Sequence, residues 1–209
     1  MHMIPSLYRV KVKGEEAKPN GGMNEFDFFS NYIPETQRNQ TYFQRCKDEI
    51  PFDTMRWNGF RLPQLAFLYD LSRDTPNKIP ILDELISKLE KDYGCNVVSV
   101  WCNLFEDGDH HIDWHQDQYG CHTFVLSFGS PRKVLYRKKR GLLSSEKILA
   151  EHTTTNGDMY YFSPVWDKKT EHCVPKMKES VGPRISLVFF VSRPFTSNKW
   201  GTVLRLLAS

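Results

Sequence analysis

The sequence predicts a mainly β protein with flanking helices (α+β), whose strands form a double-stranded β-helix, or jelly roll. From residue 97 onward the chain divides into short strand-like runs between Gly or Pro turns, at 97–105, 122–128, 133–138, 158–162 and 184–191. Most of these runs are apolar on both faces, which indicates two sheets packed against each other. A jelly roll closes such sheets into a sandwich and brings strand ends that are distant in sequence to one mouth.

A single domain is expected, because 209 residues with 40% hydrophobic and 13% aromatic content can bury a substantial core. We expect a partly disordered N-terminal extension over residues 1–24, a folded domain over 25–195 and a tail over 196–209. The net charge of +3 and the pI of about 8.5 are compatible with a polyanionic partner without requiring one.

The five cysteines form no C-x-x-C pair, and their odd number argues against a disulfide framework, which indicates a reducing compartment. Near the metal-ligand candidates identified below, Cys121 and Cys173 are interpreted as small buried residues. The sequence has no apolar segment typical of a signal peptide and no run as long as a membrane span. We therefore expect a soluble, intracellular monomer in the cytoplasm or nucleus.

Two helices are predicted before the first strong strand. Residues 35–50 place Tyr42, Phe43, Cys46 and Ile50 at helical spacing. Residues 80–94 place their apolar side chains on one face and end at a glycine, as a helix that packs on a sheet does.

Between these helices, residues 52–69 mix aromatics with glycine and proline, which predicts a hairpin or an irregular strand pair. We assign residues 35–75 to a substrate-recognition flap. Cations and aromatic faces alternate there in a composition suited to stacking on an extruded base. An aromatic edge that packs on the core explains each of these residues equally well. They are Arg56, Trp57, Phe60, Arg61 and Tyr69.

The stretch 101–129 holds a His-x-Asp pair, His115 and Asp117, between two strand-like runs. Residues i and i+2 of an extended chain share a face, so an imidazole nitrogen and a carboxylate can reach one point. A second histidine would complete the two-His-one-carboxylate set that holds Fe(II) and leaves positions open. His172 is the candidate. An isolated His-x-Asp is usually a surface turn, but the strands around this pair favour a metal site.

The order of motifs resembles the AlkB group of Fe(II)/2-oxoglutarate-dependent dioxygenases, which oxidatively remove alkyl groups from nucleobases. The resemblance covers roughly residues 50–191. The motifs that carry it are Asn103-Leu104-Phe105, His115-Gln116-Asp117, Leu126-Ser127-Phe128-Gly129, Gly157-Asp158, His172 and Pro183-Arg184-Ile185-Ser186-Leu187, with Pro63-Gln64-Leu65 and Asp107-Gly108 upstream.

The resemblance implies that His115, Asp117 and His172 bind iron and catalyse the reaction. It also implies that Arg184 pairs with the distal carboxylate of 2-oxoglutarate and that Asn103 contacts this cosubstrate near the metal. Ser186 is a further expected cosubstrate contact, in a position where the family often has Asn.

Three more positions depart from the family pattern. Phe105 stands where the family has a tyrosine hydroxyl, and Phe190 stands where it has a second arginine. Tyr119 replaces an acidic side chain that faces the base in DNA-repair members. The cosubstrate pocket is therefore expected to be more apolar than usual, and base preference does not carry over.

A basic run at residues 132–140 is expected to project cations from a sheet edge toward phosphates, which supply much of nucleic-acid affinity. A solvated face explains such a run as well. The predicted substrate-binding residues are Arg56, Trp57, Tyr119, Arg137, Lys138 and Arg140, and the patch extends to Lys168, Lys169, Lys176 and Lys178.

Together these features predict an Fe(II)- and 2-oxoglutarate-dependent dioxygenase that demethylates or hydroxylates alkylated nucleobases in DNA or RNA, using O2. Two alternatives stay open. The same iron site could hydroxylate a protein side chain or a small metabolite. The changes at Phe105, Ser186 and Phe190 are also compatible with a nucleic-acid-binding module that has weakened catalysis.

Overall fold

The computed structural model describes residues 24–34, 37–57, 59–71, 78–117, 120–139 and 147–192. Residues 1–23 of the expected N-terminal extension and the expected tail at 196–209 lie outside these residues, so the domain boundaries stay predictions. No helix in the described part of the chain is long and apolar enough to cross a membrane.

The larger sheet contains seven antiparallel strands of the described chain. They are β1 (Phe26–Phe29), β2 (Asp53–Trp57), β3 (Phe60–Asp70), β4 (Val97–Phe105), β6 (His122–Gly129), β9 (Met159–Phe162) and β11 (Arg184–Val191). Their spatial order is β1-β9-β6-β11-β4-β3-β2. The last strand, β11, therefore lies in the middle, between β6 and β4.

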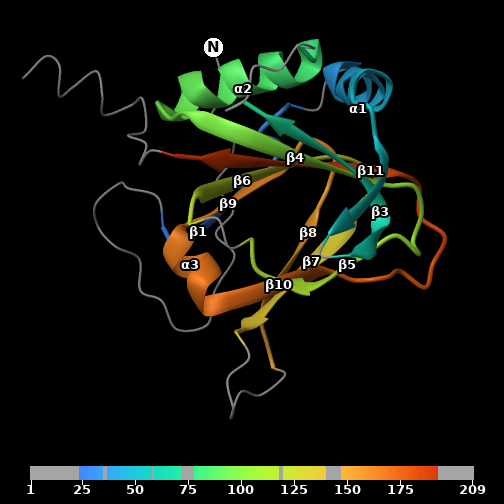
Figure 1. Ribbon diagram of the computed structural model, residues 1–209, viewed down its shortest axis with the longest axis vertical. Helices are drawn as coiled ribbons and strands as arrows, with labels where there is room; N and C mark the ends of the chain where they lie inside the picture. Colours follow the sequence, from blue (N-terminus) through green and yellow to red (C-terminus); the bar gives the residue numbers. More distant parts are fainter. Residues whose placement is uncertain are drawn as a thin grey trace, which may run out of the picture.

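The smaller sheet has the order β5-β10-β7-β8. Its strands are β5 (Ile112–His115), β7 (Arg132–Lys138), β8 (Ile148–Thr154) and β10 (Thr170–Val174). From β4 to β11 the chain passes repeatedly between the two sheets, which face each other in Figure 1. This is the predicted jelly roll, and the expected fold class is confirmed.

Two helices, α1 (Gln37–Glu49) and α2 (Pro80–Tyr93), cover the outer face of the larger sheet (Figure 1). Both occupy the positions that the apolar spacing predicts. The helix α2 ends at Gly94, whose φ of 62° is left-handed and whose N–H donates to Glu90 O at 2.8 Å. The buried face of α2 consists of Ile81, Leu82, Leu85, Ile86 and Leu89.

Strand alternation divides the buried residues into two cores. The outer core, between the larger sheet and the helices, includes Leu82, Leu85, Val100, Cys102 and Leu104. The inner core lies between the two sheets, and its buried members are Phe28, Phe105, Val125, Val134, Tyr136, Tyr160, Phe162, Trp166 and Val174. Since successive residues of a strand point to opposite faces, one strand such as β4 serves both cores.

The five predicted strands from residue 97 onward are confirmed within a residue at each end, and residues 52–69 form the predicted strand pair as β2 and β3. The sequence patterns do not predict β1, β5, β8, β10 or the short helix α3 (Pro164–Lys169). These elements are only 4–7 residues long, so each carries too few apolar positions to show a period.

Candidate metal centre between the two sheets

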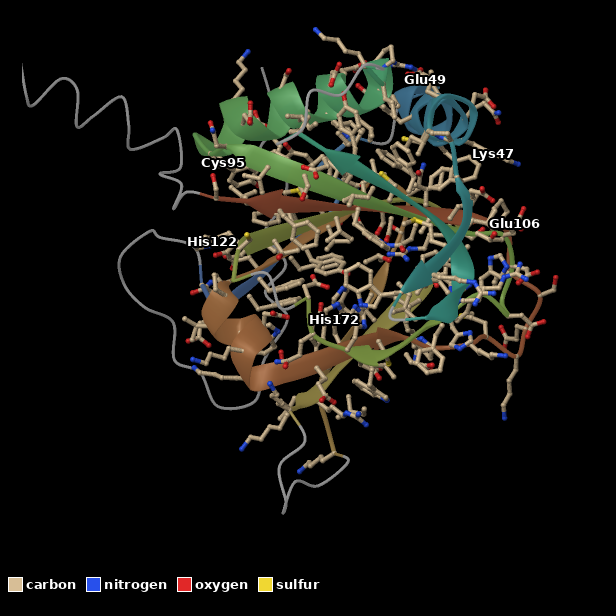
Figure 2. The ribbon with its side chains drawn as sticks, in the orientation of Figure 1. Lys47, Glu49, Cys95, Glu106, His122 and His172 are labelled. Carbon is tan, nitrogen blue, oxygen red and sulfur yellow. The ribbon has the colours of Figure 1, made fainter. Side chains whose placement is uncertain are left out.

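His115 and His172 meet because β5 and β10 are neighbours in the smaller sheet, where the two histidines are paired in register. Figure 2 shows His172 between the two sheets. Asp117 lies two residues beyond His115, just after the end of β5. The three residues that the sequence analysis selected are therefore brought together by strand pairing.

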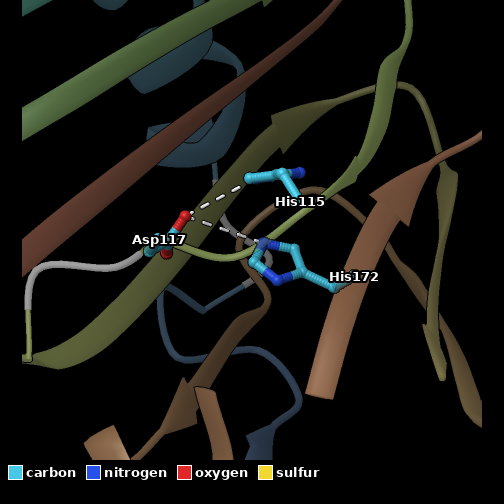
Figure 3. A group of neighbouring side chains, drawn as sticks. All are labelled: His115, Asp117 and His172. Carbon is cyan, nitrogen blue, oxygen red and sulfur yellow. Dashed lines mark ion pairs between the residues drawn. The ribbon is translucent and has the colours of Figure 1, made fainter. Parts of the chain in front are cut away.

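The three side chains converge on one point (Figure 3). Asp117 Oδ1 lies 3.5 Å from His115 Nε2 and 3.8 Å from His172 Nε2. The two imidazole ring centres are 4.2 Å apart. His115 is the most exposed of the three, with 35% of its side chain exposed against 13% for Asp117 and 9% for His172. His115 therefore faces the open side of the cluster.

A hydrogen bond to the main chain sets the orientation of His115. Its Nδ1 lies 2.8 Å from Asp113 O, and a carbonyl oxygen can only accept, so Nδ1 carries the proton. In the neutral ring the lone pair is then on Nε2, which faces Asp117, and in the protonated ring Nε2 donates to Asp117. Metal-binding histidines commonly donate their second N–H in this way.

Residues of α3 and the start of β10 hydrogen-bond to the chain at Asp117. The sequence patterns did not predict this support. The Asp117 N–H donates to Asp167 Oδ1 at 3.1 Å. The neighbouring Gln116 Nε2 donates to Thr170 O at 3.0 Å and to the carbonyl of Asp167. The signal for α3 is in the sequence: Ser163 caps the helix by accepting from Trp166 N at 3.2 Å, and Pro164 follows at the first position.

The electrostatics favour an ionised Asp117 carboxylate, raise the pKa of His115 and keep His172 neutral. Burial raises the pKa of Asp117, but the hydrogen bond from His115 and the charges of both histidines outweigh it, so the pKa is lowered. Burial lowers the pKa of His115, but Asp117 outweighs it and raises the net pKa. Burial and the neighbouring His115 lower the pKa of His172 to about 3.

This donor set fits a divalent metal ion. Its three ligand atoms lie within 4.8 Å of one another. Asp117 Oδ2 is buried and has no hydrogen-bond partner among the described residues, a cost that coordination would remove. Two imidazoles and one carboxylate are the donors that suit non-haem Fe(II) and leave other positions open.

Arg184 lies at the start of β11, buried with only 1% of its surface exposed. Its Nη2 donates to Ser127 Oγ at 2.9 Å, and its Cζ lies 5.1 Å from the centre of the Phe105 ring. Its Nε and Nη1 have no partner in the described structure. Burial lowers its pKa to about 10, so it stays charged at neutral pH. A buried guanidinium with two free donors is a fitting site for a carboxylate.

Asn103 and Ser186, the other predicted cosubstrate residues, are paired in register on β4 and β11. Asn103 Nδ2 donates to Ser186 Oγ at 3.3 Å, and its Oδ1 accepts from Gln64 Nε2 at 3.0 Å and from Trp101 Nε1 at 2.9 Å. Gln64 is thus a supporting residue to which the sequence analysis gave no role. Cosubstrate contact by Asn103 and Ser186 stays a prediction.

The predicted flap residues include both exposed and buried side chains. Arg56 and Trp57 lie on the exposed end of β2, and the Trp57 ring lies 5.7 Å from the Trp101 ring in an edge-to-face contact. Phe60 is 78% exposed. The expectation that Tyr69 belongs to this clamp is wrong, because Tyr69 is buried in the outer core and donates to Asp83 Oδ1 at 2.9 Å.

The basic run differs from its expectation at two positions. Arg132 points inward, where its guanidinium donates to the carbonyls of Asp107, His110 and Pro175. Arg137 points outward but is covered, because its partner in β10, Glu171, binds it at 2.8 Å and the Trp114 ring lies 4.2 Å from its Cζ.

The other described cations of the predicted patch are exposed, and they are Lys133, Lys138, Lys139, Lys168, Lys169, Lys176 and Lys178. Lys169 pairs with Glu25 Oε1 at 3.0 Å. Tyr119 and Arg140 lie outside the described residues. Binding roles for this set, and for Arg56 and Trp57, stay predictions.

Comparison with curated proteins finds relatives that include alkB homolog 3 from four mammals. The chain is 29% identical over 161 residues to the human alpha-ketoglutarate-dependent dioxygenase alkB homolog 3, covering 68% of this chain and 54% of the relative. The mouse protein of the same name is 29% identical over 148 residues, covering 64% and 49%. The chain thus spans about half the length of these relatives. No family model matches the chain.

Comparison with solved structures supports the same fold. OsALKBH1 superposes with a TM-score of 0.56 at 13% identity, covering 88% of this chain and 99% of that one. A prolyl-4-hydroxylase from Pseudomonas putida gives 0.54 at 13% identity, covering 81% and 93%. At these identities the likeness shows the fold alone. The AlkB resemblance expected from the motifs is confirmed by the sequence relatives and the shared fold together.

Proposed function

We propose that this chain, whose sequence and fold are AlkB-like, is an Fe(II)/2-oxoglutarate-dependent dioxygenase that demethylates or hydroxylates alkylated nucleobases in DNA or RNA. One observation carries the proposal. The inter-sheet space holds a His-Asp-His cluster and an arginine, and one carboxylate oxygen of the cluster and two nitrogens of the arginine have no partner among the described residues. A metal and a dicarboxylate cosubstrate would satisfy these buried groups together.

His115, Asp117 and His172 would hold Fe(II), and Arg184 would bind the distal carboxylate of 2-oxoglutarate through its free Nε and Nη1 donors. Bound iron, with 2-oxoglutarate and O2, supplies the oxidising chemistry that hydroxylates a substrate C–H bond. The protein's own work is to fix these groups before substrate arrives. Asp113 O sets the His115 tautomer, and Asp167 fixes the Asp117 main chain.

The proposed nucleic-acid substrate is supported by the AlkB resemblance and by the surface of the β2–β3 hairpin. Trp57 and Phe60 are exposed large aromatics, 49% and 78% exposed, and Arg56 lies beside them. Trp57 also touches Trp101, which donates to Asn103 inside the sandwich. The aromatic hairpin is therefore connected to the predicted cosubstrate residues, and an extruded base could stack there.

Product analysis tests the proposal. Wild-type protein with Fe(II), 2-oxoglutarate and N-methylated single- and double-stranded oligonucleotides should form succinate and formaldehyde in equal amounts, and Asp117→Ala should form neither. Succinate without formaldehyde, with no change in the mass of the oligonucleotide, would instead favour a protein side chain or a metabolite as substrate. No succinate in any assay would contradict the enzymatic proposal.

We further propose a monomer in the reducing cytoplasm or nucleus. None of the five cysteines, all in the described chain, forms a disulfide, and Cys46, Cys95, Cys102 and Cys173 are buried. Sedimentation at micromolar concentration checks the oligomeric state, and imaging of the tagged protein checks the compartment.

A further inference from the structure

Three buried polar side chains of the inter-sheet space have no role in the site described so far. Tyr136 comes from β7, His152 from β8 and Tyr160 from β9, so each is on a different strand. The His152 ring lies 5.6 Å from the Tyr136 ring and 4.7 Å from the Tyr160 ring. We call these three residues the polar wall.

The polar wall lies close to both the metal cluster and Arg184. Tyr136 is paired in register with His172, and their ring centres are 5.8 Å apart. The charges of both Asp117 and Arg184 act on the pKa of each tyrosine, so both hydroxyls lie near these two groups. Each hydroxyl also lies close to the other. A molecule that reached from the metal to Arg184 would pass along them.

The wall is rich in hydrogen-bonding capacity that the protein does not use. Both ring nitrogens of His152 are buried without a partner in the described chain, and the Tyr136 hydroxyl makes no hydrogen bond of normal geometry there although Tyr160 is near. Leaving buried polar atoms unpaired is costly, so such a cluster indicates a ligand. His152 is a neutral group here, because burial lowers its pKa to about 3.

A carboxylate bound by Arg184 needs additional hydrogen-bond donors beside the guanidinium. Its two free nitrogens can satisfy part of a carboxylate, which has about four lone-pair positions. Phe105 offers Arg184 only a ring face, since its side chain has no hydroxyl. Phenol hydroxyls are donors of suitable length and geometry for the remaining lone pairs.

We propose that Tyr136, Tyr160 and His152 complete the cosubstrate pocket by donating hydrogen bonds to the distal carboxylate that Arg184 binds. This inference rests on the proposed function. These donors would bind the distal carboxylate of 2-oxoglutarate in a pocket where Arg184 packs against Phe105. Each Tyr→Phe change removes one oxygen atom and keeps the ring that packs in the inner core.

Calorimetric titration of the Mn(II)-loaded protein tests the inference with two probes, 2-oxoglutarate and 2-oxopentanoate, which has the same carbon chain without the distal carboxylate. Tyr136→Phe and Tyr160→Phe should each weaken 2-oxoglutarate binding roughly 10-fold or more, as loss of a hydrogen bond to a charged group does. His152→Leu should weaken it as well. None of these variants should change the affinity for 2-oxopentanoate.

Tyr161→Phe is the matched control. Tyr161 is the next residue of β9, faces the outer core and is hydrogen-bonded to His122 Nδ1 at 2.7 Å. It should bind both probes as the wild type does. Equal weakening of both probes by the wall variants would mean that the wall only supports packing, and unchanged 2-oxoglutarate affinity would also overturn the inference. If wild type itself binds 2-oxoglutarate no better than 2-oxopentanoate, the proposed function fails instead, and the inference with it.

Discussion

The two faces of the larger sheet bury very different chemistry. On its outer face, toward α1 and α2, the core is apolar, and polar groups at its rim are paired, as Tyr69 is with Asp83 and Tyr32 with Asp92. On its inner face, toward the smaller sheet, Asp117, His152 and Arg184 each have buried polar atoms without a partner in the described part of the chain.

Stability and ligand binding therefore depend on different faces of the larger sheet. Apolar burial stabilises the fold roughly in proportion to area, whereas unpaired buried polar groups cost free energy. The outer core therefore stabilises the protein. The inner core contains groups that lower stability until a ligand satisfies them, which is typical of functional sites.

The largest effect is expected at the metal cluster. Asp117→Ala removes one of three ligands and should abolish turnover and weaken Mn(II) or Fe(II) binding by about 100-fold or more, because two ligands hold these ions poorly against water. Metal titration followed by activity measures this. Asp113→Ala is the control, since its carboxylate points to solvent and only its main chain contacts His115. Full activity of Asp117→Ala would remove this residue from the site.

Substitution in the outer core should separate stability from binding. Leu85→Ala should lower the free energy of unfolding by about 2–5 kcal/mol, since Leu85 is 3% exposed among apolar neighbours. Metal affinity of the folded fraction should not change. Urea denaturation checks the first expectation, with Ile148→Ala, at a 39% exposed site, as the control near zero. A loss of metal affinity in Leu85→Ala would show that the two cores are not independent.

Arg184→Met should weaken ligand binding without lowering stability, which is the reverse of the effect expected for Leu85→Ala. It removes the partner of the distal carboxylate and should weaken 2-oxoglutarate binding by about 2–5 kcal/mol. The ligand-free protein should become slightly more stable, because a buried charge with two unpaired donors is replaced by an apolar side chain of similar length. Calorimetry and thermal unfolding measure the two effects. Arg184→Lys should also weaken binding, because an ammonium cannot form the bidentate pair.

The inner core should also make stability depend on pH. The pKa of His152 is about 3 in the folded protein and about 6.5 when unfolded, so only the unfolded state takes up the proton between these values. Its contribution is therefore fully present above pH 6.5 and is lost as the pH falls, by about 2 kcal/mol at pH 5. Metal-free His152→Leu should lose this part of the pH dependence, as measured by urea denaturation at pH 5 and pH 8. An identical pH dependence in both proteins would contradict it.

The smallest effect concerns the exposed cations of the smaller sheet. Replacing Lys138 and Lys139 with Gln should reduce the slope of log binding constant against log salt by about 0.7–0.9 for each lost phosphate contact. Arg137 is unsuitable for this test, because Glu171 and Trp114 hold it. Lys91→Gln, on the exposed face of α2, is the control. An unchanged slope would place the nucleic acid on another surface.

Local patterns in the sequence predict the elements with a strong period and the motifs of fixed spacing. The five strands from residue 97, both long helices and the choice of His115, Asp117 and His172 follow from alternation, helical spacing and motif order. The signals for the strands, the helices and the His115–Asp117 pair are local, whereas the choice of His172 rests on the order of motifs along the chain.

Contacts between side chains of separate strands follow from the tertiary structure and not from any local pattern. The pairing of β5 with β10, the support of Asp117 by Asp167, and the covering of Arg137 by Glu171 all depend on contacts between distant segments. The meeting of Tyr136, His152 and Tyr160 beside Arg184 is of the same kind. No local pattern encodes these contacts, since strand order and register are set by the packing of the whole sandwich.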